Sequence, residues 1–135
     1  MVLVDSAVWI GLLCAQETGP VALLRKLLEA GEAAVAPVII QEILQGATSP
    51  ESLEKLRRHF LALPILEPRR GAETYASAAA LYARCRWQGL TPRSPHDCLI
   101  VQLAVEHNVP LLHDDRDFET LARVEPGLQL LPRTC

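Results

Sequence analysis

The sequence predicts an α/β fold: an open parallel sheet of about five strands with helices on both faces. Short apolar runs alternate with longer segments of helical periodicity, which is the order that parallel strands and crossover helices produce. The first run, Val2-Leu3-Val4, shows no polar alternation, as expected for a strand buried on both faces. The length of 135 residues suits a single domain over residues 1–135.

The N-terminal half contains clear start and stop signals for helices. One expected helix has Pro20 in its first turn and Gly31 just past its end. Pro37 suits the first turn of a second helix, which should stop by Gly46, and Ser49 precedes a third. The elements expected here are strands at residues 2–4 and 33–36 and helices at residues 20–30, 37–44 and 49–63.

The C-terminal half continues the alternation. Residues 71–88 are rich in alanine and are followed by Gly89, so they predict a helix of about five turns. Residues 90–95 are expected to form a loop. The remaining elements are short apolar runs and amphipathic segments: strands at residues 64–67, 110–113 and 128–131 and helices at residues 96–107 and 116–123.

Composition limits the function classes. The net charge of −3 argues against a protein that holds nucleic acid by a basic surface alone. The four cysteines form no C-x-x-C pair, which makes a zinc knuckle improbable and fits a reducing compartment. No apolar run approaches membrane-spanning length, and no positive segment precedes the first apolar run. We therefore expect a cytoplasmic protein with no membrane partner.

Acidic residues stand at four breaks between apolar segments. Parallel sheets place their functional crevice beyond the carboxyl ends of the strands. Two of these acids follow expected strands, one lies about one turn into a helix, and one lies in the first turn of a helix. They are Asp5, Glu42, Asp97 and Asp115. Although they are spread over the chain, this fold would bring them together at one edge of the sheet.

Each acid also has a plain structural explanation. Ser94-x-x-Asp97 matches a helix capping box, and Asp114 or Asp115 would serve as a helix N-cap. Glu42 could be a solvated helix residue. Asp5 is harder to explain this way, because it ends a strand where solvent is limited.

Considered together, the four acids favour a metal site. Carboxylates that meet within ~5 Å repel one another unless a divalent cation lies between them. A donor set of oxygen atoms alone points to a hard cation, so Mg²⁺ or Mn²⁺ is expected rather than zinc.

The same residues resemble the PIN-domain ribonucleases, especially VapC-like toxins of type II toxin-antitoxin systems. The resemblance spans the chain in four short segments, none of them specific alone. They are Val2-Leu3-Val4-Asp5-Ser6-Ala7-Val8-Trp9-Ile10; Ile39-Ile40-Gln41-Glu42-Ile43-Leu44-Gln45-Gly46; Leu90-Thr91 with His96-Asp97-Cys98-Leu99-Ile100; and Leu111-Leu112-His113-Asp114-Asp115-Arg116-Asp117-Phe118.

The resemblance implies roles for individual residues. Asp5, Glu42 and Asp97 match the three acidic metal and catalytic positions, Asp115 best matches the fourth, and Asp117 would assist in metal binding. Ser6 matches a hydroxyl residue beside the first acid. Two positions depart from the family: Ala7 stands where Ser or Asn is common, and His113 where Thr or Ser is frequent. These departures remove polar partners that would position the ligands.

The resemblance also implies an activity and partners. It implies an endoribonuclease that hydrolyses RNA phosphodiester bonds, acts as a toxin, forms a homodimer and is neutralised by a small antitoxin. Metal chemistry is consistent with this, because a bound cation acidifies water and neutralises phosphate charge. In-line attack would leave a 5′-phosphate and a 3′-hydroxyl.

Local arginines are the expected substrate contacts, since guanidinium binds phosphate through two hydrogen bonds. Arg84, Arg86 and Arg93 precede Asp97 and are the expected RNA-binding residues, although a solvated helix face would have the same pattern. Trp87 would either stack on a base or pack against the protein.

Two other functions remain open. One is a different metal-dependent phosphohydrolase with an acidic pocket, although a phosphatase would need a second Asp at the position of Ala7. A receiver domain would need an acidic cluster after its first strand and a phosphoacceptor Asp ending the third, which Glu67-Pro68 does not supply. The other is a non-catalytic PIN-like module that binds RNA or protein. The target RNA, the number of metals, the antitoxin and the choice of fourth ligand among Asp114, Asp115 and Asp117 are not determined by the sequence.

Overall fold

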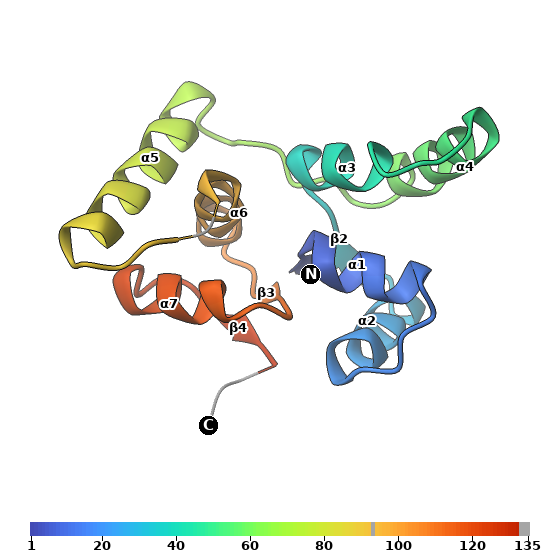
Figure 1. Ribbon diagram of the computed structural model, residues 1–135, viewed down its shortest axis with the longest axis horizontal. Coiled ribbons are helices and arrows are strands. Elements are labelled where there is room, and N and C mark those ends of the chain that lie inside the picture. The colour runs from blue at the N-terminus through green and yellow to red at the C-terminus, as the bar shows by residue number, and fades with distance from the viewer. Residues whose placement is uncertain (93, 133–135) are drawn as a thin grey trace.

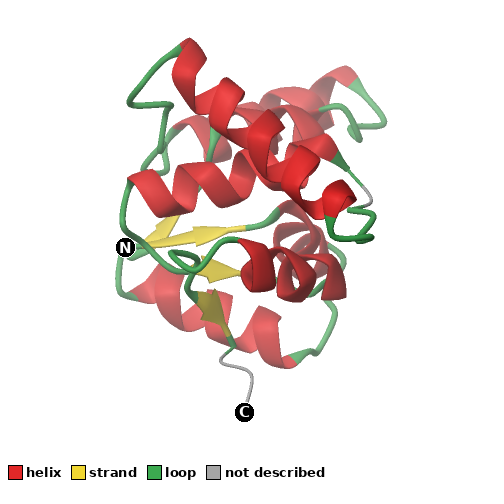
Figure 2. Cartoon of the chain, turned by 90° about the vertical axis from the view of Figure 1, so that its left-hand side faces the viewer, coloured by secondary structure: helices red, strands yellow, loops and turns green. Residues whose placement is uncertain are grey.

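A parallel sheet forms the centre of the molecule. The computed structural model describes residues 1–92 and 94–132. Its strands are β1 (Val2–Val4), β2 (Ala33–Ala34), β3 (Leu111–Leu112) and β4 (Leu130–Leu131), in the order β2-β1-β3-β4, and all pairs are parallel. Figure 2 shows the strands as one layer with helices on either side. The expected α/β class with helices on both faces is confirmed.

Seven helices occur in the described part of the chain. Their bounds are α1 (Ser6–Leu13), α2 (Gly19–Glu29), α3 (Pro37–Leu44), α4 (Pro50–Leu61), α5 (Ala72–Trp87), α6 (Pro95–Glu106) and α7 (Arg116–Val124). Helices α5, α6 and α7 pack on one another, while α1 packs against α2 and α3. Figure 1 shows these as two groups around the sheet, with α4 beside α3.

Helix α1 was not predicted from the sequence. The segment Val8–Cys14 is apolar on all sides, so it shows no helical periodicity. The helix nevertheless begins at once after β1, because the Asp5 carboxylate accepts a hydrogen bond from the Ala7 N–H and caps it. Inward-facing Val8 and Trp9 are buried, whereas Ile10 and Leu13 are exposed.

The prediction of a strand at residues 64–67 is wrong. The sheet of the described residues has four strands rather than about five. Ile65 forms a single parallel bridge with Val35. The Val35 N–H donates to the Pro64 carbonyl (3.0 Å), and the Leu66 N–H donates to the Val35 carbonyl (2.8 Å). Pro64 and Pro68 have no N–H to extend this pairing into a strand.

The register of the sheet determines where the acids emerge. Val4 pairs with Leu112, and the Asp5 N–H donates to the Leu112 carbonyl (3.0 Å). Residues that follow β1 and β3 therefore leave the same edge of the sheet side by side. Strand β1 is buried throughout, and so is the run Cys98–Ala104 of α6. The start of α6 is therefore fixed in place by the buried residues that follow it, which pack with α5 and α7. No helix in the described residues is long and apolar enough to cross a membrane.

Candidate active site

Five carboxylates gather at the carboxyl edge of the sheet. Their mutual influence appears most clearly at Asp97, in the first turn of α6. Burial, and after it the charges of four other acids, raise the pKa of Asp97 from 3.8 to about 7. In order of decreasing effect these are Asp5, Asp115, Asp117 and Glu42. Four separate elements thus bring their acids to one place, as the strand-end argument predicted.

Asp5 is the most deeply buried of these acids, with 5% of its surface exposed. Its pKa is raised from 3.8 to about 6, chiefly by burial and to a smaller extent by the charges of Glu42 and Asp115. The backbone N–H groups of Ala7 and Ser6 act in the opposite direction. A buried carboxyl group in this state exchanges its proton near neutral pH, or ionises fully when a cation is bound beside it.

Glu42 reaches the site from the second turn of α3. The Ser6 hydroxyl donates to its Oε2 atom at 2.9 Å, which joins α3 to the start of α1. The other oxygen, Oε1, is buried and has no hydrogen-bond partner among the described residues. A buried carboxylate oxygen without a partner is costly, and it is the kind of donor that a cation would satisfy.

Asp115 and its neighbours form the turn between β3 and α7. Asp115 is the N-cap of α7, and its Oδ1 accepts from the Asp117 N–H at 2.9 Å. Asp115 is therefore both a cap and a member of the acidic cluster. Asp114 is exposed and is not among the charges that raise the pKa of Asp5 or Asp97. Of the three candidates for the fourth ligand, the geometry favours Asp115 and disfavours Asp114.

The capping explanation for Asp97 accounts for only part of the geometry. The Ser94 hydroxyl oxygen accepts from the His96 N–H (3.1 Å), and the Ser94 carbonyl accepts from the Asp97 N–H (3.2 Å). Among the described residues, no hydrogen bond runs from the Ser94 N–H back to the Asp97 carboxylate, as a full capping box would require. The Asp97 carboxyl group lies close enough to the other acids for their charges to raise its pKa.

His113 has a role that the sequence did not indicate. It is buried at the end of β3, and its Nδ1 lies 2.9 Å from the Asp115 carbonyl and 3.2 Å from the Asp115 nitrogen. Its ring also packs edge-on against Phe118. Where the family commonly has Thr or Ser, this chain holds the turn before Asp115 with an imidazole. In the sequence, only its position two residues before Asp115 could have indicated this contact.

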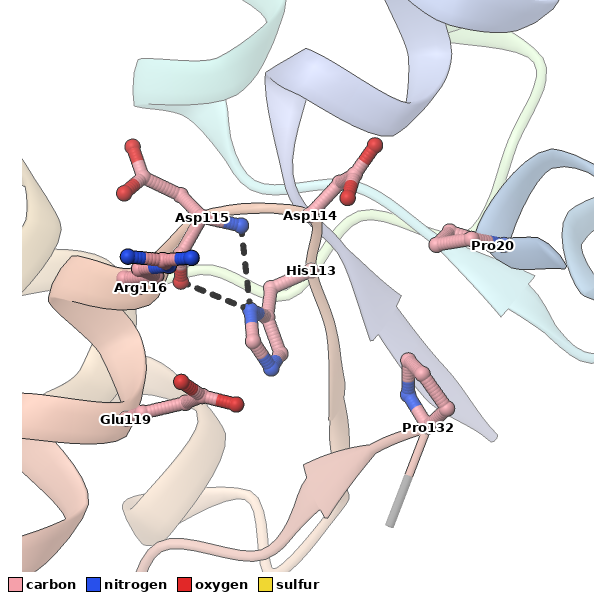
Figure 3. Close-up of a pocket in the computed structure, with 7 residues that line it drawn as sticks. All are labelled: Pro20, His113, Asp114, Asp115, Arg116, Glu119 and Pro132. Atoms are coloured by element: carbon pink, nitrogen blue, oxygen red, sulfur yellow. Dashed lines mark hydrogen bonds between the residues drawn. The ribbon is translucent and has the colours of Figure 1, made fainter. Parts of the chain in front are cut away.

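A cavity of about 440 Å³ borders the cluster on the far side of this turn. Figure 3 shows the His113 ring pointing into it beside Glu119, while the carboxylates of Asp114 and Asp115 point the opposite way. The carboxylates of Asp114 and Asp115 are therefore directed away from the His113 ring, although both residues line this cavity.

The donor set of the acidic cluster fits a hard divalent cation. All of its donors are carboxylate oxygens, one buried oxygen lacks a partner, and like charges raise two pKa values. In the described residues, however, no three His, Cys, Asp or Glu side chains have the arrangement of a formed metal site. Like charges separate when no cation lies between them, so the ligand geometry would be completed by binding.

The expected arginine contacts are only partly available. Arg84 forms an ion pair with Glu125 at 3.2 Å, from α5 to the end of α7, so in this structure it stabilises the protein. Arg86 is exposed in the last turn of α5. Arg93 lies outside the described residues. Trp87 is 80% exposed, so it does not pack against the protein. It is also not among the described residues that line the cavities beside the acids, so this structure gives no support to a stacking role for it.

Known proteins resemble this chain along nearly its whole length. The family model of the PIN domain matches residues 2–124. VapC ribonuclease Mb1587 of Mycobacterium bovis and Ribonuclease VapC11 of Mycobacterium tuberculosis are each 37% identical over 128 residues, covering 92% of this chain and 93% of the relative.

Solved structures show the same fold at lower identity. VapBC2 from Rickettsia felis, bound to a DNA fragment from its promoter, matches with a TM-score of 0.72 and 19% identity, covering 96% of this chain and 97% of the other. FitAcB from Neisseria gonorrhoeae matches with a TM-score of 0.68 and 15% identity, covering 96% of each chain.

Proposed function

This chain belongs to the PIN-domain family, and we propose that it is an endoribonuclease that hydrolyses RNA phosphodiester bonds with the help of a divalent cation. The observation that carries the proposal is the effect of four carboxylates, from three other elements, on the pKa of Asp97. Such a convergence of negative charge is unfavourable in a folded protein unless it binds cations. The two mycobacterial relatives that cover most of this chain are named as ribonucleases.

The cation we propose is Mg²⁺ or Mn²⁺, held by Asp5, Glu42, Asp97 and Asp115, with Asp117 assisting. Oxygen-only ligands suit these ions better than softer metals. When bound, the cation would acidify the attacking water and neutralise the scissile phosphate.

The chain's own residues orient this chemistry. Ser6 holds one oxygen of Glu42 and leaves the other available. The Asp5 and Asp115 side chains cap α1 and α7, which restricts their rotamers before any ligand binds. Preorganised ligands of this kind lose little entropy on binding. The RNA strand would approach over the outer face of the cluster, with exposed Arg86 as a candidate phosphate contact.

The proposed biological role is that of a toxin neutralised by a small antitoxin. The structures from Rickettsia felis, from Klebsiella pneumoniae and from Salmonella typhimurium are VapBC or toxin-antitoxin complexes, and VapC is the name of the closely matching mycobacterial relatives. We further propose that the protein forms a homodimer and acts in the cytoplasm, where RNA is present.

Cleavage of a panel of structured RNAs tests the nuclease proposal. Wild type should cut in Mg²⁺ or Mn²⁺, and Asp5→Asn and Asp97→Asn should abolish cutting while remaining folded. Asp114→Asn is the matched control, because it removes an exposed neighbouring acid, and it should retain activity. Equal cutting by the Asp5→Asn or Asp97→Asn variant, or undiminished cutting by wild type in excess chelator, would contradict the proposal.

A further inference from the structure

A second cavity opens between α3, α5 and α6, and it has no place in the proposed metal chemistry. Its volume is about 420 Å³, within the range of ligand-binding pockets. Figure 1 shows α6 end-on between α5 and α3. The residues that line it include Val38, Gln41, Tyr75, Ala78, His96 and Leu99.

The cavity adjoins the proposed catalytic acids. Gln41 directly precedes Glu42 on α3, and His96 directly precedes Asp97 on α6. On each of these two helices, one residue lines the cavity and the residue after it belongs to the acidic cluster. A strand of RNA with a phosphate at the acids would bring a neighbouring nucleotide to this opening.

The lining chemistry suits a flat heteroaromatic group. Tyr75 is 56% exposed although it is a large aromatic side chain, and it stands beside buried Ala78 and Leu99. Gln41 and His96 are exposed and supply hydrogen-bond donors and acceptors. An aromatic face with polar groups at its edge is the usual arrangement for recognition of an unstacked nucleobase.

Charge separates this cavity from the one beside His113. Asp114, Asp115 and Glu119 line that cavity, and Arg116 is the one Lys or Arg among its described lining residues. None of the described residues that line the cavity between α3, α5 and α6 is acidic. An RNA strand is polyanionic, so it is repelled less by the lining of the α3–α5–α6 cavity than by the acidic lining of the cavity beside His113.

We propose that the α3–α5–α6 cavity binds a nucleobase of the RNA that flanks the scissile phosphate. Tyr75 stacks on the base, and Gln41 and His96 bond to its edge, so these residues set a preference for particular bases near the cut. The inference rests on the proposed ribonuclease function, since it concerns the substrate of that same site.

Ribonucleosides provide a probe that does not depend on cleavage. We suggest titrating the protein with adenosine, cytidine, guanosine and uridine in turn, in chelator, while recording NMR signals of the Tyr75 and His96 rings. At least one nucleoside should shift both rings. Tyr75→Ala should abolish the shift at His96, whereas Tyr75→Phe should keep it because the stacking face remains. Because Tyr75 is exposed, neither change is expected to disturb the core.

Trp87→Ala is the matched control, since it removes an even more exposed aromatic ring from the far end of the same helix. In cleavage of a randomised RNA pool, Tyr75→Ala should raise KM at least about fivefold, the loss expected for one stacked base. It should also flatten the base preference beside the cut. Trp87→Ala should change neither, and Gln41→Ala should alter which base is preferred.

The other possible results show separately whether the base-binding proposal or the nuclease proposal is wrong. The absence of any nucleoside shift would overturn the base site, as would loss of preference in Trp87→Ala alone. If Tyr75→Ala weakened self-association and left the cut pattern unchanged, the cavity would be an interface between copies of this chain, and the base site would be wrong. Nucleoside shifts without RNA cleavage in Mg²⁺ or Mn²⁺ would instead contradict the nuclease function and leave base binding supported.

Discussion

Replacing Asp5 with asparagine should stabilise the protein when divalent cations are absent. Burial, with the charges of Glu42 and Asp115, raises the Asp5 pKa from 3.8 to about 6. A pKa that is higher in the folded state gives stability that is present below the unfolded value and is lost as the pH rises through the folded value. At about 1.4 kcal/mol for each pH unit between the two values, ionised Asp5 costs the folded state about 3 kcal/mol.

Asparagine removes this cost and keeps the helix cap, because Asn and Asp are equally good N-cap residues. In chelator at about pH 8, urea unfolding followed by circular dichroism should therefore give Asp5→Asn up to about 3 kcal/mol more free energy of unfolding than wild type. With Mn²⁺ at a hundred times its Kd, wild type should gain about 2.7 kcal/mol, and the variant should gain little. The metal should thus cancel the stability difference.

Asp114→Asn is the control for this comparison. Asp114 is an exposed acid in the neighbouring turn and does not raise the pKa of Asp5, so its removal should change stability by less than about 0.5 kcal/mol with or without metal. The reasoning would be refuted if Asp5→Asn were less stable than wild type in chelator at this pH, or if both proteins gained equally from Mn²⁺.

Three other interactions are tested by a change of pH or by a single substitution. Because burial and like charges raise the Asp97 pKa from 3.8 to about 7, metal-free protein should lose stability in urea titrations as pH rises through that interval; a gain would contradict this. Ser6→Ala removes the 2.9 Å bond to Glu42, so it should cost about 1 kcal/mol of stability and weaken Mn²⁺ binding in calorimetry; unchanged affinity would disprove the positioning role. Glu106→Gln breaks the 3.2 Å ion pair with Arg70, so the free energy of unfolding in urea should fall by about 2 kcal/mol. Metal binding should not change, because Glu106 is at the opposite end of α6 from Asp97.

Most of the fold was predictable because its helices carry local signals. Pro37 and Ser49 begin α3 and α4 as expected, and Gly31 follows α2. Helix α1 was missed because its residues are apolar on every side, so burial in the tertiary structure rather than periodicity determines it. The residues around Ile65 have the composition of a strand, but flanking prolines restrict them to one bridge.

The acidic cluster was predictable for a different reason: parallel strands release their following residues at a common edge. The order of strands and helices is enough to predict this edge, and Asp5 and Asp115 both lie there, after β1 and β3. Local patterns do not reveal which side chains will contact one another in the folded chain. Arg84 meets Glu125 across 41 positions of sequence, and His113 folds back on the turn at Asp115. Both contacts depend on the packed structure.

The end groups of the cleaved RNA test the central claim most directly. If acids that hold a divalent cation direct water at the phosphate, the 5′ end of each downstream product should carry a phosphate and the upstream product a 3′-hydroxyl. Mass spectrometry of products from a short oligoribonucleotide, cut in Mn²⁺, measures this. We predict 5′-phosphate ends that are lost with Asp97→Asn. Products with a 2′,3′-cyclic phosphate and a 5′-hydroxyl would show that the RNA itself supplies the nucleophile, and they would contradict the account.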